Sequence, residues 1–205
     1  MHKEILTKEQ IELLPLISSF SKKFGLVGGA AVALHIGHRE SLDFDMFSLK
    51  PFGNMQLRQK IADQVRIDQV LVNKKREFTG IIKGVKITFF HYPFPITFTE
   101  KLGYEIRLAD LLTLAAMKAY ALGMREKWKD YVDLYFIIKD YYPVGKIAEK
   151  AREIFGSDFN ERGFRNQLAY FDDIDYSEKV IWMPGFKTSE KTIEQFLEKK
   201  SINNT

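Results

Sequence analysis

The segment DFDMF, which begins at Asp43, most constrains what this chain can fold into. Polar and apolar residues alternate along it, and this period of two is typical of a β-strand with one buried face. Asp43 and Asp45 would then project from one face, and Phe44 and Met46 from the opposite, core-facing one. A strand is therefore predicted over residues 41–48, inside a sheet that a hydrophobic layer covers.

A pair of glycines precedes this strand. Residues 24–27 are predicted to form a short strand that ends at Gly28-Gly29, and residues 30–36 have the alanine and leucine content of a helix. A turn without side chains lets backbone N–H groups and the positive end of the helix approach an anion such as a triphosphate. The order strand, glycine turn, helix, strand therefore predicts a candidate phosphate site.

Asp43 and Asp45 place two negative charges close together. The strand rise separates their Cα atoms by about 6.6 Å, and two carboxylates at roughly 5 Å repel by about 3 kcal/mol at an effective dielectric of ~20. Solvent, Arg39 or a hard dication such as Mg²⁺ could offset this repulsion. Arg39 could instead bind phosphate, and Ser41 joins it among the candidate nucleotide-binding residues.

The rest of the chain predicts an α+β fold, with a mixed sheet and flanking helices followed by a helical C-terminal region. Thr7 and Gln10 form a capping box at the start of a first helix. We expect an α/β core over residues 1–95 and a helical region over 96–205, packed as one compact unit and joined between Phe94-Pro95 and Tyr104. The predicted strands are 68–74, 78–83 and 85–92, with a hairpin at Lys83-Gly84, and the predicted helices are 7–23, 54–65, 109–123, 127–141, 145–155, 161–171 and 188–200.

Composition excludes several classes of protein. Of 205 residues 45% are hydrophobic and 28% charged, as in soluble globular proteins. The longest nearly apolar run, Leu26–Gly37, is too short to span a bilayer, so no membrane partner is expected. The absence of cysteine removes disulfides and thiolate metal sites, and the N-terminus lacks the pattern of a secretory signal, which favours a cytoplasmic location. A net charge of +4 is compatible with phosphate binding without deciding it.

The spacing of the two motifs resembles a known signature. Val27-Gly28-Gly29, then thirteen residues, then Asp43-Phe44-Asp45-Met46 is similar to the signature of the polymerase-β nucleotidyltransferase superfamily. Three blocks, LVGGAAVALHIGHRESLDFDMFS, LADLLTLAAMKAYALGMREKWKDYVDLYFI and NQLAYFDDIDY, further resemble the AbiEii/AbiGii toxin family of nucleotidyltransferases. This similarity spans most of residues 24–176.

The resemblance implies a prokaryotic transferase with a polymerase-β-like fold. It implies Mg²⁺-dependent transfer of a nucleoside monophosphate from a nucleoside triphosphate (NTP) to an acceptor hydroxyl, chiefly on RNA at the tRNA acceptor end. Many members are the toxin halves of toxin–antitoxin or abortive-infection systems, so an antitoxin is an implied partner.

The same resemblance assigns roles to individual residues. Gly28 and Gly29 match the nucleotide-binding turn, and Asp43 and Asp45 match the catalytic, metal-binding pair. Lys118 matches the catalytic lysine expected to meet the NTP phosphates, and the catalytic acidic block matches Asp130 and Asp133. Arg125 could also face phosphate, because it lies seven residues after Lys118 and would share its helix face if the helix extends that far.

Structural alternatives exist for these residues. Lys118 lies on an otherwise apolar helix and could be a surface lysine whose stem is buried. Lys129 and Asp133 are spaced i,i+4 and could form an ordinary exposed ion pair.

One departure from the superfamily pattern affects function. Many relatives carry a third catalytic carboxylate on a later strand, but VKITFFHY offers only Thr88 or Phe90 there. Asp68, at the start of an earlier strand, is a possible substitute. A degenerate nucleotide- or partner-binding protein is therefore an alternative, as is an antibiotic-type transferase that modifies a small molecule.

Overall fold

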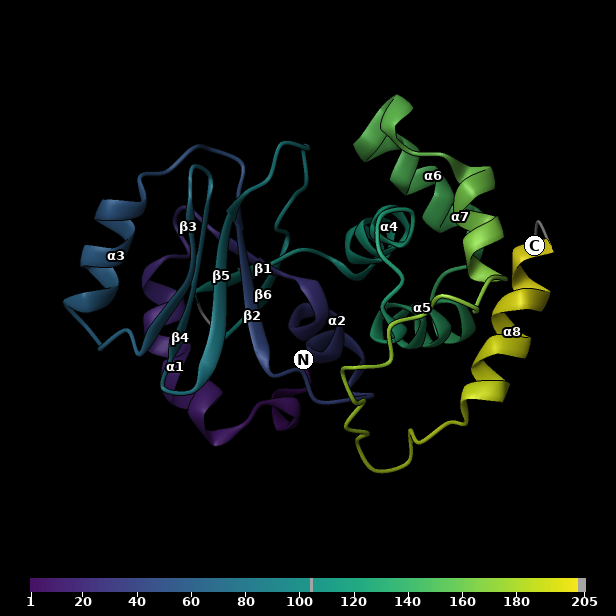
Figure 1. Ribbon diagram of the computed structural model, residues 1–205, viewed down its shortest axis with the longest axis horizontal. Helices are drawn as coiled ribbons and strands as arrows, with labels where there is room; N and C mark the ends of the chain where they lie inside the picture. The colour runs from purple at the N-terminus through teal and green to yellow at the C-terminus, as the bar shows by residue number, and fades with distance from the viewer. Residues whose placement is uncertain (104, 203–205) are drawn as a thin grey trace. The chain divides into compact units, whose positions relative to one another are not determined.

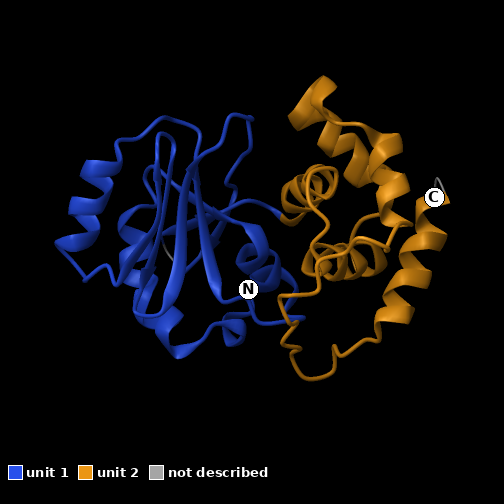
Figure 2. Cartoon of the chain, viewed as in Figure 1, with its two compact units in different colours: residues 1–110 blue, residues 111–205 orange. Residues whose placement is uncertain are grey.

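A computed structural model describes residues 1–103 and 105–202 and has the α+β fold expected from the sequence (Figure 1). The chain divides into two compact units, Met1–Asp110 and Leu111–Thr205 (Figure 2). Sequence reasoning placed the division after Pro95, ahead of two short strands that the structure adds to the sheet of the first unit. Tyr104, at the end of the predicted joint, lies outside the described residues.

The first unit is built on a seven-stranded sheet within the described residues, in the order β3-β4-β5-β2-β1-β7-β6. The strand β2 pairs antiparallel with β1 and parallel with β5, which places it near the middle of the sheet. The hairpin predicted at Lys83-Gly84 is confirmed, and both residues have positive φ angles. The strands are β1 (Gly25–Val27), β2 (Asp43–Ser48), β3 (Gln69–Lys74), β4 (Glu77–Ile82), β5 (Val85–His91), β6 (Glu100–Leu102) and β7 (Ile106–Leu108).

The two faces of β2 differ as the alternation predicted. Phe44 and Met46 are fully buried, and the alternate residues are half-buried. The helices α1 (Lys8–Ser19) and α3 (Asn54–Ala62) cover the buried face. Phe20, directly after α1, packs edge-on against Phe89 of β5 with ring centroids 5.0 Å apart. Asp43 and Asp45 therefore project from the face of the sheet opposite α1 and α3.

Helix α1 begins with the predicted capping box and ends at Ser19, four residues earlier than expected. Gln10 of this box has a second role, because its side-chain amide donates a 2.7 Å hydrogen bond to the backbone oxygen of Ser41. This buried bond ties α1 to the loop that leads into β2. A short 3-10 turn, Lys3–Ile5, precedes α1.

The second unit is built mainly from helices, with an irregular segment between Leu168 and Glu190. Tyr120 of α4 stacks on Phe155 of α6 at 4.2 Å, and Tyr135 of α5 meets Phe196 of α8 at 5.0 Å. All five helices were predicted, within a few residues at their ends. They are α4 (Leu111–Leu122), α5 (Trp128–Asp140), α6 (Val144–Phe155), α7 (Glu161–Leu168) and α8 (Glu190–Ile202), with a 3-10 turn at Gly156–Asp158. Among the described residues, no helix has both the length and the apolarity that a membrane span requires.

Candidate functional site

Gly28 forms the sharp turn between β1 and α2 (Gly28–Ile36). Its φ of +70° lies in the left-handed region, where glycine is favoured. A Cβ at this position would lie 2.1 Å from Oδ2 of Asp45, which is inside any real contact distance. The carboxylate of Asp45 therefore lies directly against the glycine turn, as the joint spacing of the two motifs predicted.

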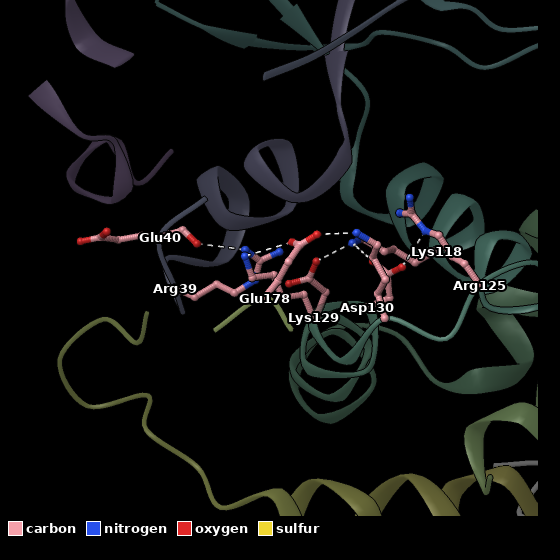
Figure 3. Close-up of polar contacts among 9 residues, drawn as sticks. Arg39, Glu40, Lys118, Arg125, Lys129, Asp130 and Glu178 are labelled. Carbon is pink, nitrogen blue, oxygen red and sulfur yellow. Dashed lines mark hydrogen bonds and ion pairs between the residues drawn. The ribbon is translucent and has the colours of Figure 1, made fainter. Parts of the chain in front are cut away.

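Gly29 makes room for two further predicted residues. A Cβ at Gly29 would lie 2.8 Å from an Nη atom of Arg39 and 3.2 Å from Oγ of Ser41. Arg39 is 2% exposed, and its other Nη atom donates a 2.9 Å hydrogen bond to the backbone oxygen of Glu40 (Figure 3). Arg39 is thus part of the wall behind the turn, in a position compatible with phosphate binding as well as with support of the loop.

Asp43 has a cationic neighbour that the sequence reasoning missed. On β5, Lys86 lies beside Asp43 in the register, and its Nζ is 2.5 Å from Oδ2 of Asp43. Lys86 therefore offsets part of the repulsion between Asp43 and Asp45. The spacing of Lys86 and Thr88 in VKITF was visible in the sequence, but their place beside Asp43 and Asp45 depends on strand register.

The strand register shows which residue stands where a third catalytic carboxylate was expected. Thr88 lies beside Asp45 in the β2–β5 register. Asp68 is wrong as a substitute: its backbone N–H bonds to Ile81 of β4, and its carboxylate accepts from the N–H of Gly84. Because β4 and β5 separate it from β2, Asp68 lies about 14 Å from Asp43 at the usual strand spacing.

The donor set fits a magnesium ion that also binds substrate. Among the described residues, no group of three or more His, Cys, Asp or Glu side chains is arranged to hold a metal. Mg²⁺ commonly takes one or two carboxylates and completes its shell with water and phosphate oxygens. Asp43 and Asp45 on one strand face, next to a turn suited to phosphate, match this pattern.

The second unit brings four more of the predicted residues into one charge cluster, in which Lys118, Asp130 and Asp133 are buried and Arg125 is exposed. Nζ of Lys118, from α4, is 2.7 Å from Oδ2 of Asp133 and also contacts Oδ1 of Asp130, both from α5 (Figure 3). Lys118 is 7% exposed and Asp133 is fully buried, so the alternative of a surface lysine is wrong. Helix α4 ends at Leu122, so Arg125 does not share its face, yet Nε of Arg125 lies 3.2 Å from the other oxygen of Asp130.

Lys129 does not form the i,i+4 pair with Asp133 that was offered as an alternative. Its Nζ lies 3.2 Å from Glu178, to which Lys127 also donates a hydrogen bond. The hydrogen bond from Lys127, with a further contribution from Lys129, lowers the pKa of Glu178 to about 2. These contacts fix the segment around Glu178 to the start of α5.

The family model described as "Nucleotidyl transferase AbiEii toxin, Type IV TA system" matches residues 85–202. This match covers more than half of the 205 residues. The chain belongs to the AbiEii nucleotidyl transferase toxin family.

Relatives of this AbiEii family member extend the similarity beyond the matched residues. The Aquifex aeolicus (strain VF5) protein aq_aa25 is 32% identical over 177 residues, covering 82% of this chain and 84% of its own. MenT4, a nucleotidyltransferase toxin from Mycobacterium tuberculosis H37Rv, has a similar structure with a TM-score of 0.65, at 10% identity and with 95% and 82% of the two chains covered. The crystal structure of a candidate nucleotidyltransferase from Helicobacter pylori has a TM-score of 0.56, at 12% identity, and the likeness covers 96% of this chain and 94% of that one.

The match to the AbiEii model includes Lys118, Asp130 and Asp133 but begins at Val85, after the glycine turn and the aspartate pair. The structural likenesses are all at low identity and establish the fold of a nucleotidyltransferase. Gly28, Asp43 and Asp45 therefore lie outside the matched residues, and their geometry in the first unit is what relates them to a nucleotidyltransferase site.

Proposed function

We propose that this AbiEii protein is a Mg²⁺-dependent nucleotidyltransferase that moves a nucleoside monophosphate from an NTP to a hydroxyl of RNA, with the tRNA acceptor end as the first candidate. One observation carries the proposal: Oδ2 of Asp45 lies where a side chain at Gly28 would begin, with Asp43 on the same strand face. This arrangement brings a metal-binding carboxylate and a phosphate-binding turn to one place.

Each residue of the first unit has a role in this proposal. Backbone N–H groups at the start of α2 bind phosphate oxygens, helped by the positive end of the helix. Gly28 and Gly29 allow the approach, and Arg39 and Ser41 support the turn from behind. Asp43 and Asp45 hold Mg²⁺, which, when bound, supplies positive charge that stabilises the phosphate oxygens during in-line transfer.

The charge cluster of the second unit is proposed to take part in the same reaction. Lys118 is the family's candidate for neutralising charge on the departing pyrophosphate, with Asp130 and Asp133 as the carboxylates that orient it. Arg125 is more exposed and contacts Asp130, so it is a second candidate for phosphate.

Incubation of the protein with each α-labelled NTP, Mg²⁺ and a tRNA pool tests the proposal. Label is expected to enter RNA, and D43N/D45N is expected to abolish transfer. The control D63N/D68N removes two exposed carboxylates of the same unit, outside the candidate site, and is expected to transfer normally. Transfer that survives D43N/D45N would refute the role of the pair.

A toxin role is a further part of this proposal, supported by the family and by MenT4. Induction of the wild-type chain in a bacterial host is expected to arrest growth, whereas induction of D43N/D45N to the same level is not. Equal growth arrest by the wild-type chain and D43N/D45N would show that toxicity does not depend on nucleotide transfer.

Thr88 supports a second candidate function, a nucleotide-binding protein without turnover. It stands beside Asp45 in the register, where a third carboxylate would be expected in a full catalytic set. This alternative predicts that NTP binds, in calorimetry, without dependence on Mg²⁺ and that no RNA, protein or small-molecule acceptor is labelled.

A further inference from the structure

A pocket of about 540 Å³ lies on the side of the sheet opposite Asp43 and Asp45. Phe24, one of its lining residues, packs against Phe89 on the buried face, whereas Thr88 and Asp45 belong to the other face. Figure 1 shows the helices α1 and α3 that border it. The lining comes from the end of α1 and the residues after it, from the loop 51–53, and from α3.

The floor of the pocket is aromatic. Phe20 and Phe24 are buried, and Phe52 meets Phe24 edge-on with centroids 5.1 Å apart. Phe52 is half-buried, so part of its ring remains accessible from the pocket. An aromatic floor of this kind suits a flat ring, because a base can pack against Phe52 with its face or edge.

The rim of the pocket is cationic. Its lining includes Lys22, Lys23 and Lys60 and, in the part of the chain that the structure describes, no aspartate or glutamate. Lys60 is already engaged: its Nζ donates to the backbone oxygen of Ser19 and lies 4.5 Å from the centroid of the Phe20 ring. Lys22 and Lys23 are exposed and, among the described residues, neither is within ion-pair distance of a carboxylate.

The end of α1 does not account for Lys22 and Lys23. Lysines near a helix C-terminus often meet its last carbonyl groups. Here backbone N–H groups of Phe20, Ser21 and Lys23 bond to the oxygens of Ile17, Ser18 and Phe20, and Lys60 meets Ser19. The terminus is thus satisfied, and the ammonium groups of Lys22 and Lys23 are available to an anion.

We propose that this pocket is a second nucleotide site, separate from the Asp43–Asp45 site, which binds the base of a nucleotide against Phe52 and its phosphate at Lys22 and Lys23. Its volume is in the range of small-molecule sites, which is roughly 300–1,000 Å³. The nucleotide can come from free solution or be one residue of an RNA strand, because both present the same base and phosphate.

Two probes separate these sources, a fluorescein-labelled single-stranded RNA decamer and a fluorescent derivative of AMP. Both are titrated with the full chain in EDTA, so that the readout does not depend on transfer or on Mg²⁺. K22Q/K23Q is expected to weaken binding of the probe that the pocket accepts about tenfold. For the RNA probe it is also expected to reduce the slope of log K against log salt by about 0.7, the value for one lost phosphate contact. Phe52→Leu is expected to weaken it about fivefold or more through lost stacking.

Matched controls keep the result specific. K74Q/K75Q removes two adjacent exposed lysines at the turn between β3 and β4, in the same unit, and is expected to bind as wild type. Phe94→Leu removes a half-buried ring outside the pocket. Equal loss in K22Q/K23Q and K74Q/K75Q, or unchanged binding of both probes in K22Q/K23Q, would overturn the second site. The proposed transfer reaction stands or falls separately, with D43N/D45N.

Discussion

The carboxylate of Asp45 occupies the space in front of Gly28, so that a Cβ at Gly28 would be only 2.1 Å from Oδ2. Val27, which precedes this glycine, pairs directly with Asp45 across the antiparallel strands β1 and β2. Backbone register therefore holds the glycine turn and Asp45 side by side. Any side chain at position 28 must displace one of them.

Gly28→Ala is expected to lower transfer on the order of 100-fold, because it displaces the Asp45 carboxylate by an ångström or more. It also introduces a non-glycine residue at φ +70°, at a cost of roughly 1–2 kcal/mol. Gly84→Ala is the matched control: Gly84 has a φ of +76° with no atom within 4 Å of the added Cβ. Urea unfolding should show a similar loss of unfolding free energy in both variants, and only Gly28→Ala should lose nucleotide transfer. Normal transfer by folded Gly28→Ala would contradict the close approach.

Lys86 competes with a cation for Asp43. Its Nζ is 2.5 Å from Oδ2 of Asp43, so a magnesium ion at Asp43 has to compete with this ion pair. Lys86→Met is expected to tighten Mg²⁺ binding by about 1.5- to 5-fold, the equivalent of one exposed ion pair. The shift of the melting temperature with Mg²⁺ concentration measures this without any reaction.

Lys83→Met is the control for Lys86→Met, because Lys83 forms a similarly exposed pair with Glu12. It should leave the Mg²⁺ dependence of the melting temperature unchanged. If Mg²⁺ raised the melting temperature of Lys86→Met less than that of Lys83→Met, Lys86 would be assisting Mg²⁺ binding.

The parts of the fold that depend on local patterns were predictable. The alternation from Asp43 onward determined the faces of β2, and Lys83-Gly84 determined the hairpin. The strands β6 and β7 were missed because each has three residues, too few for a recognisable period, and neither is followed by a glycine pair like the one that marks the end of β1. The strand β7 forms by pairing with β1, where Leu26 meets Leu108, a contact between residues far apart in the sequence.

The candidate site was likewise predictable only where it depends on local sequence patterns. The spacing of Gly28 and Asp45 was enough to predict that they meet, because one helix connects two adjacent strands. Lys86 was missed as a site residue because its contact with Asp43 depends on strand register. The hydrogen bond from Gln10 to Ser41 was missed because it joins residues 31 positions apart in the sequence. Lys118 and Asp133 were assigned through the family resemblance, and the structure shows them in contact.

Lys118 is expected to be essential for stability. Lys118→Met removes the buried ammonium group that contacts both Asp130 and Asp133 and leaves Asp130 with Arg125, which costs roughly 3–5 kcal/mol of unfolding free energy. Lys139→Met, at an exposed position of α5, should change it by less than about 0.5 kcal/mol. Urea unfolding measures both.

The triple variant K118M/D130N/D133N separates stability from function. It removes the buried charges together and is expected to recover much of the stability lost in Lys118→Met. If Lys118 binds phosphate, the folded triple variant should still fail to transfer nucleotides. Recovery of transfer along with stability would show that the cluster acts only in packing α4 against α5.

Glu178 is expected to make the second unit sensitive to acid. Hydrogen bonds from Lys127 and Lys129 lower its pKa from 4.5 to about 2, so the folded state favours the charged carboxylate. The stabilisation is therefore fully present above pH 4.5 and is lost progressively as the pH falls from 4.5 towards 2. Free energies of unfolding measured between pH 6 and 3 should fall less steeply in Glu178→Gln than in wild type. Glu198→Gln, an exposed change on α8, is the control and should follow the wild-type pH dependence. If the unfolding free energy of Glu178→Gln fell as steeply with pH as that of wild type, the contacts with Lys127 and Lys129 would not stabilise the fold.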